Sequence, residues 1–173
     1  MGAKVSKPFF KGGGFLGGGV SVGANGAIFT MTGGTISENR ATSAGAGINT
    51  AGTTTIAGGH IENNHGIGVR LQAGSLTMSA GYITGNETAS TNFQAGSGVF
   101  IFAGTFTMTG GEISGNRDMG TGGFGGGIHN YNGTADIQGG TISKIRVNPD
   151  SSPDSNSKFE YCVNSTAYGI LSE

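Results

Sequence analysis

The sequence is poor in cysteine, proline, charged residues and long apolar runs. It has one cysteine, Cys162, which excludes an internal disulfide, and three prolines among 173 residues. Charged residues make up 11% of the chain and the formal net charge is −1, so neither nucleic acid nor an anionic membrane surface is indicated as a partner. No run approaches the about 18 apolar residues of a membrane-spanning helix, so we expect no membrane insertion.

Glycine is what the sequence has in excess. It accounts for 37 of the 173 residues, about three times the usual share of ~7%, and the scarcity of proline excludes a collagen-like chain. The N-terminal residues are basic, but lysine and glycine interrupt their apolar pairs, so the core of a signal peptide is missing. The length fits one domain of ordinary size.

The glycines belong to an internal repeat. The step between the second residues of successive repeat pairs is 25, 22, 30 and 29 residues, which is typical of a solenoid whose fixed strands are joined by loops of variable length. The copies read GGTISEN from Gly33, GGHIENN from Gly58, AGYITGN from Ala80, GGEISGN from Gly110 and GGTISKI from Gly139.

Each repeat contains three short strand patterns and no segment with helical periodicity of adequate length. A unit of this kind cannot bury its apolar face alone, so neighbouring units have to stack. We therefore predict an all-β fold, a single-stranded right-handed parallel β-helix (a three-sheet β-solenoid) of about five coils. The residues expected in its core are Phe29, Met31, Ile56, Leu76, Met78, Phe106, Met108 and Ile137 from one strand, and Val20, Ile48, Val69, Val99 and Ile128 from another.

An asparagine closes four of the five copies. In a stack of coils these side chains would lie above one another and bond through their amides along the axis. Asparagine also tolerates the left-handed backbone conformation that such a corner requires. We expect a structural ladder, without a catalytic role, formed by Asn39, Asn64, Asn86 and Asn116.

The GGxI tetrapeptides, followed by I-x-x-N at Ile36 to Asn39, Ile61 to Asn64, Ile83 to Asn86 and Ile113 to Asn116, resemble a known class of repeat. They are similar to the glycine-rich repeats of bacterial surface β-helix proteins, of the polymorphic outer membrane protein and autotransporter adhesin passenger type. The resemblance implies an extracellular or cell-surface module with a role in adhesion or scaffolding. It brings no catalytic residues and no cofactor.

The chain divides into four parts by composition. Residues 1–16 are a cap or connector, 17–145 carry the β-helix repeats, 146–157 form a polar linker, and 158–173 are a strand-like segment. That last segment either caps its own chain or is donated to a neighbouring subunit. The apolar residues expected in capping or assembly are Phe9, Phe10, Phe15, Leu16, Phe159, Tyr161 and Val163.

Two patterns raise the question of an enzyme. A G-x-G-x-x-G runs from Gly120 to Gly125, but a dinucleotide site needs it between a strand and a helix, and here a short strand pattern follows. The other pattern is an outward column in which His60, Tyr82 and Glu112 stack beside Glu62. It is the candidate site of a polysaccharide-binding or polysaccharide-cleaving domain, although a solvated polar surface is the favoured explanation and a third ligand for a metal at His60 and Glu62 is missing.

Two further outward columns are candidates for binding. Thr30, Thr55, Thr77 and Thr107 stack into a flat array similar to the threonine arrays of ice-binding solenoids, although threonine is also simply favoured on exposed strands. In a second column, which also contains His129, we expect an exposed Phe100 beside Arg70, able to stack on a sugar or a partner chain. His65 and His129 are expected at the surface.

Together these patterns favour a non-enzymatic structural module that assembles into a fibre or carries adhesion. The expected partner is a second copy of the chain, with a host surface or polysaccharide as further possibilities. A polysaccharide-acting domain is the alternative, and ice binding is the third hypothesis.

Overall fold

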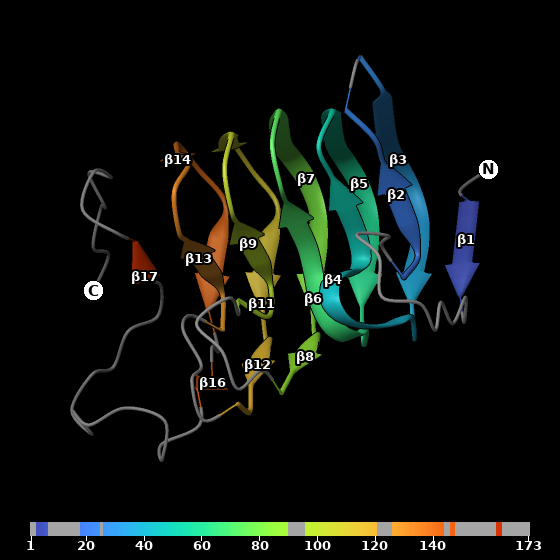
Figure 1. The fold of residues 1–173 in the computed structure, drawn as a ribbon, viewed down its shortest axis with the longest axis vertical. Helices are drawn as coiled ribbons and strands as arrows, with labels where there is room; N and C mark the ends of the chain where they lie inside the picture. The colour runs from blue at the N-terminus through green and yellow to red at the C-terminus, as the bar shows by residue number, and fades with distance from the viewer. Residues whose placement is uncertain are drawn as a thin grey trace.

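The structure, a computed structural model, describes residues 3–6, 18–24, 26–89, 96–120, 126–143, 146–147 and 162–163, with the backbone alone at 3–6, 42–44, 146–147 and 162–163. These residues form an all-β fold without a helix, in which parallel strands stack as a β-solenoid of about four turns. Figure 1 shows the strands side by side along the axis, with β1 at one end and β17 at the other. The predicted parallel β-solenoid is confirmed.

The first sheet has eight strands, and its main path follows every second strand of the first part of the chain. Because successive repeats supply these strands, like residues pair with like, as Ile36 with Ile61 and Ile61 with Ile83. The path runs through β1 (Ala3–Ser6), β3 (Ile28–Ser37), β5 (Thr53–Glu62), β7 (Ser75–Thr84), β10 (Thr105–Met108) and β14 (Thr134–Ile137), with β11 (Glu112–Ser114) and β15 (Thr141–Ser143) beside it.

The second sheet has nine strands and supplies the remaining sides of each coil. It contains two ladders that meet at β6, and every pairing in it is parallel. The first comprises β2 (Val20–Val22), β4 (Arg40–Thr50), β6 (His65–Leu71), β9 (Val99–Ile101), β13 (Ile128–Asn130) and β17 (Cys162–Val163); the second adds β8 (Glu87–Thr88), β12 (Arg117–Asp118) and β16 (Arg146–Val147).

The glycine pairs turn the chain between the two halves of the long strands. The second glycine of each pair has φ of 85° at Gly34, 90° at Gly59, 92° at Gly81, 91° at Gly111 and 96° at Gly140, a conformation that side chains disfavour. In β3 and β5 strand pairing continues through this corner, with register shifts on either side of Thr32 in the β3–β5 pair. The corner is therefore a bulge inside β3, β5 and β7, whereas in the later coils it separates β10 from β11 and β14 from β15.

The core consists of stacked columns inside the coils. Ile56, Ile61, Leu76, Met78 and Ile83 are completely buried, and equivalent residues of other coils lie above and below them. Burial of these side chains is the main favourable contribution to stability.

Two threonines interrupt the core columns, and the first, Thr50, is completely buried. Thr54 is also completely buried, and its hydroxyl donates to the Thr50 hydroxyl over 2.7 Å, which offsets the cost of burying a polar group.

The described terminal strands pair within the chain. β1 pairs with the second half of β3, β16 pairs with β12, and β17 pairs with β13. Pairing thus extends to Val147, two residues into the segment that we expect to be a linker. The candidate capping residues Phe9, Phe10, Phe15, Leu16, Phe159 and Tyr161 lie outside the described residues, and of Val163 only the backbone is described.

Candidate functional site

The four repeated asparagines lie in one internal column, each at most 1% exposed. The Asn64 Oδ1 accepts from the Asn39 backbone N–H at 3.0 Å and from the Asn39 Nδ2 at 2.9 Å, and the same pattern links Asn64 to Asn86 and Asn86 to Asn116. The Asn64 Nδ2 also donates to the Ile36 carbonyl of the preceding coil. Each inner amide therefore satisfies backbone groups of the turn as well as its neighbours.

The left-handed position of this turn is not the asparagine of the ladder. It is the residue before it: Glu38 with φ of 58°, Asn63 with 52°, and Gly85 and Gly115 with 63° each. Our explanation of the ladder asparagines by their tolerance of this conformation is therefore wrong. They supply the hydrogen bonds of their amides, while the preceding residue adopts the left-handed conformation of the turn.

His60, Tyr82 and Glu112 occupy successive rungs of the first sheet. The His60 and Tyr82 rings stack with centroids 4.8 Å apart and planes 10° apart, and the His60 Nδ1 lies 3.7 Å from the Glu62 Oε2. The Ser114 hydroxyl donates to the Glu112 carboxylate at 2.5 Å. The chain thus brings all four candidate residues to one surface.

This surface lacks the enclosure of an enzyme site. The stacked face of each ring is closed by the other ring, and His60 and Tyr82 are both exposed. Glu62 and Glu112 lie two rungs apart, about 9.6 Å along the axis, and two residues apart along the strand, about 7 Å, so their backbone positions are farther apart than the about 9.5 Å limit for a pair of hydrolytic carboxylates. Within the described ranges, no group of three His, Cys, Asp or Glu side chains could hold a metal ion.

A surface hollow lies at another corner, next to the asparagine ladder. It is lined by Glu38, Asn63, Asn64, His65, Gly85 and Glu87.

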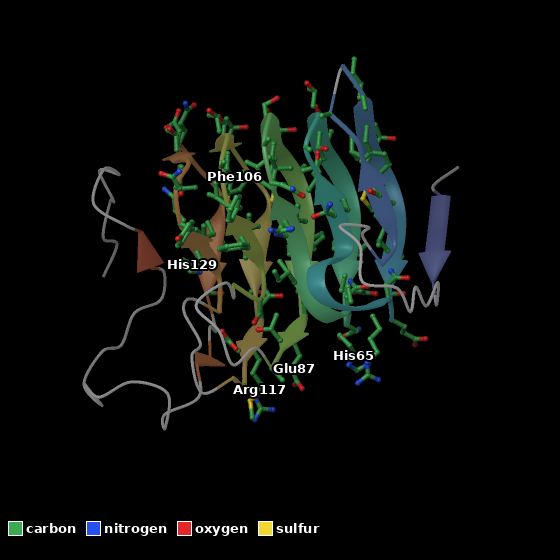
Figure 2. All side chains as sticks on the ribbon, viewed as in Figure 1. His65, Glu87, Phe106, Arg117 and His129 are labelled. Carbon is green, nitrogen blue, oxygen red and sulfur yellow. The ribbon has the colours of Figure 1, made fainter. Side chains whose placement is uncertain are left out.

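Beside this hollow, the residue after each ladder asparagine forms a charged column that sequence reasoning missed. Arg40 pairs with His65, His65 with Glu87, and Glu87 with Arg117. The Arg117 Nη1 lies 3.8 Å from the Glu87 Oε2, and His65, Glu87 and Arg117 project from one edge of the solenoid in Figure 2. The column is visible in the repeat alignment, because each of its members directly follows the asparagine.

The threonine array is in register. Thr30 pairs with Thr55, Thr55 with Thr77, and Thr77 with Thr107, and all four side chains are exposed or partly exposed. The next residue in the column is Asp136, which pairs with Thr107 and ends the array with a charge. The structure therefore brings the four threonines together as one outward column.

The predicted exposure of Phe100 and His129 is wrong. Phe100 is completely buried and His129 is 8% exposed, although strand alternation points both away from the core. The reason lies in the preceding corner: a Cβ placed on Gly96 would lie 2.7 Å from the His129 Cβ, so the corner backbone runs directly over this column. His65, by contrast, is exposed as expected.

The same column contains Arg70, whose guanidinium lies over two aromatic rings. Its Cζ is 5.9 Å from the centroid of Phe100 and 5.4 Å from that of Phe102, and Phe102 stacks on Tyr131 at 5.6 Å. Arg70 is 5% exposed, and burial lowers the pKa of its guanidinium. Cation–π contacts of this kind contribute about 0.5–2 kcal/mol, less than the several kcal/mol that burying a charge costs.

The G-x-G-x-x-G stretch is not followed by a helix. Gly120 is the one residue of this stretch that the structure describes. The chain is described again from Gly126, and β13 begins two residues later. Within the described residues no helix exists that is long and apolar enough to cross a membrane.

Comparison of the chain with protein-family models, with curated proteins and with solved structures gives no match. That the chain is related to bacterial surface repeats stays a prediction, based on the residues of the repeat alone.

Proposed function

We propose that this chain is a non-enzymatic structural module of the extracellular space or cell surface, which assembles end to end into a fibre or carries adhesion. The proposal includes the finer geometry expected from the sequence: right-handed coiling, three sheets and five coils. Right-handed crossover is the strong preference for connected parallel strands.

The observation that carries the proposal is the exposure of the core columns in the last coil of the solenoid. Leu76, Met78 and Ile83 are completely buried in a middle coil. In the last coil the equivalent Ala135 and Ile142 are only partly buried, and Ile137 is 38% exposed. The apolar core is thus left open at this end, where a further coil would close it.

The backbone of the same coil supports assembly. Among the described residues, β14 pairs with β10 alone and β15 with β11 alone, so each leaves one row of N–H and C=O groups unpaired. An open parallel edge above an exposed apolar column favours addition of another strand layer. A second copy of the chain is the partner that matches the spacing and the residue type of each column.

Electron microscopy of the purified chain and of two variants tests the proposal. Ile137→Glu places a charge in the open core column, whereas Thr134→Glu places the same charge outward on the same strand. We expect filaments from the wild type and from Thr134→Glu, and none from Ile137→Glu. Monomeric wild-type particles at high concentration, or equal filaments from all three proteins, would refute assembly through this end.

Two alternatives are each supported by one column. The stacking of His60, Tyr82 and Glu112 on one surface supports binding or cleavage of polysaccharide. The register of the threonines from Thr30 to Thr107 supports ice binding. Both remain secondary, because the first surface is open and the second ends at Asp136.

A further inference from the structure

Arg70 is a buried cation on a surface that strand alternation directs away from the core. It stands between Val69 and Leu71, which are completely buried on the inside of β6, so its own side chain points outward. It is nevertheless 5% exposed. Its ladder neighbours are Asn49 on β4 and Phe100 on β9, neither of which carries a charge.

The guanidinium has no acceptor for one of its nitrogens in the described part of the chain. Its Nη1 is buried there without a hydrogen-bond partner. The guanidinium also lies over the rings of Phe100 and Phe102. The described acidic residues belong to other columns: Glu62, Glu112 and Asp136 to the first sheet, and Glu38, Glu87 and Asp118 to the corner around the asparagine ladder. A guanidinium keeps its charge at any physiological pH, so Nη1 is left without an anionic acceptor among the described residues.

The length variation of the repeat is concentrated at the corner next to this column. From the ladder asparagine to the following core residue the distance is 9 residues to Ile48, 5 to Val69, 13 to Val99 and 12 to Ile128. From the core residue to the next asparagine the distance varies less: 16 residues from Ile48, 17 from Val69, 17 from Val99 and 19 from the equivalent Val20. Insertions in a solenoid that gather on one side often mark its binding surface.

We propose that Arg70 binds a carboxylate on the outer face of the second sheet. The Phe100 and Phe102 centroids lie 5.9 and 5.4 Å from the Arg70 Cζ and 6.3 Å from each other, so both rings flank the same side of the guanidinium and leave its other side to the acceptor. A carboxylate matches this geometry, because its two oxygens can accept from the planar fork together. Gly96 lies against His129 in the same column, so the acceptor enters past Phe102 and Tyr131, which are partly or fully exposed. The carboxylate comes either from a small acid in solution or from a side chain of a second copy.

Thermal melting in sodium acetate, against sodium chloride of equal ionic strength, tests the site. We expect acetate to raise the Tm of the wild type saturably, with no rise in Arg70→Met. The matched control is Arg117→Met, which removes an exposed arginine and retains the response. No rise in the wild type over chloride, or an equal rise in Arg70→Met, would overturn the proposal.

NMR of ¹⁵N-arginine in the wild type distinguishes the two sources and does not depend on the folding of Arg70→Met. The Arg70 Nε–H resonance, assigned with Arg70→Lys, should shift saturably with acetate while those of Arg40 and Arg117 stay in place. If the carboxylate comes from a second copy, the same shift appears without acetate as the protein concentration rises. A resonance that responds to neither titration would refute a carboxylate site.

Discussion

Replacing Asn64 with alanine should destabilise the solenoid far more than replacing Asn39. The Asn64 side chain takes part in four hydrogen bonds: it accepts two from Asn39, and it donates one to the Ile36 carbonyl and one to the Asn86 Oδ1. At about 1 kcal/mol each, with buried groups left unpaired, the loss is about 4 kcal/mol. The Asn39 side chain makes one of these bonds, so Asn39→Ala should cost about 1 kcal/mol.

Urea denaturation followed by far-UV circular dichroism measures the difference of about 3 kcal/mol between the two variants. Asn64→Asp separates hydrogen bonding from packing, because it keeps the shape of the side chain but removes both donated bonds. We expect it to be at least as destabilising as Asn64→Ala. If Asn64→Ala lies within 1 kcal/mol of Asn39→Ala, or if Asn64→Asp is neutral, the amides do not stabilise the fold as argued.

Three further substitutions test the corner and the two surfaces. Gly111→Ala should cost about 1–3 kcal/mol, because its φ is 91° and the added Cβ would lie 2.6 Å from the Met78 Cε; Gly33→Ala, with nothing within 4 Å, should be near neutral by the same urea assay. Under the structural proposal, neither the wild type nor Glu112→Gln releases reducing sugar from a polysaccharide panel, and release that this substitution abolishes would establish the enzymatic alternative. If the threonine array binds ice, Thr77→Tyr removes the thermal hysteresis of the wild type; a wild type without hysteresis excludes that function.

The register of the fold could be predicted because the repeat fixes it. Once the GGxI segments are aligned, the residues on either side follow, and the predicted column of His60, Tyr82 and Glu112 is the one that the strands form. The bulge at the glycine corners of β3, β5 and β7 was not predictable in the same way. Its residues show that the chain turns, but whether the two halves remain one strand depends on pairing with the neighbouring coil.

The burial of outward-pointing side chains such as Phe100 could not be predicted from the sequence. Alternation gives the direction of the Phe100 side chain, but its exposure depends on what crosses over it, and the corner before β9 has a different length in each coil. A signal for the left-handed position was present, since glycine occupies it in two of the four copies, at Gly85 and Gly115. The buried state of Arg70 had no such signal, because an arginine in an outward column normally lies in water.

One side of the coil keeps nearly the same length throughout the solenoid, and one corner varies in length. This difference implies different roles for the two sides. The side with the glycine turns has near-constant length, so its columns continue without interruption and suit a module that extends by stacking. The corner after the asparagine ladder changes length from coil to coil, so no column that it covers can be uniform. Arg70, Phe100 and His129 accordingly differ from one another in chemistry while sharing one position of the repeat. A surface made of unlike residues at equivalent positions is suited to recognising one particular group, which the regular side of the fold is not.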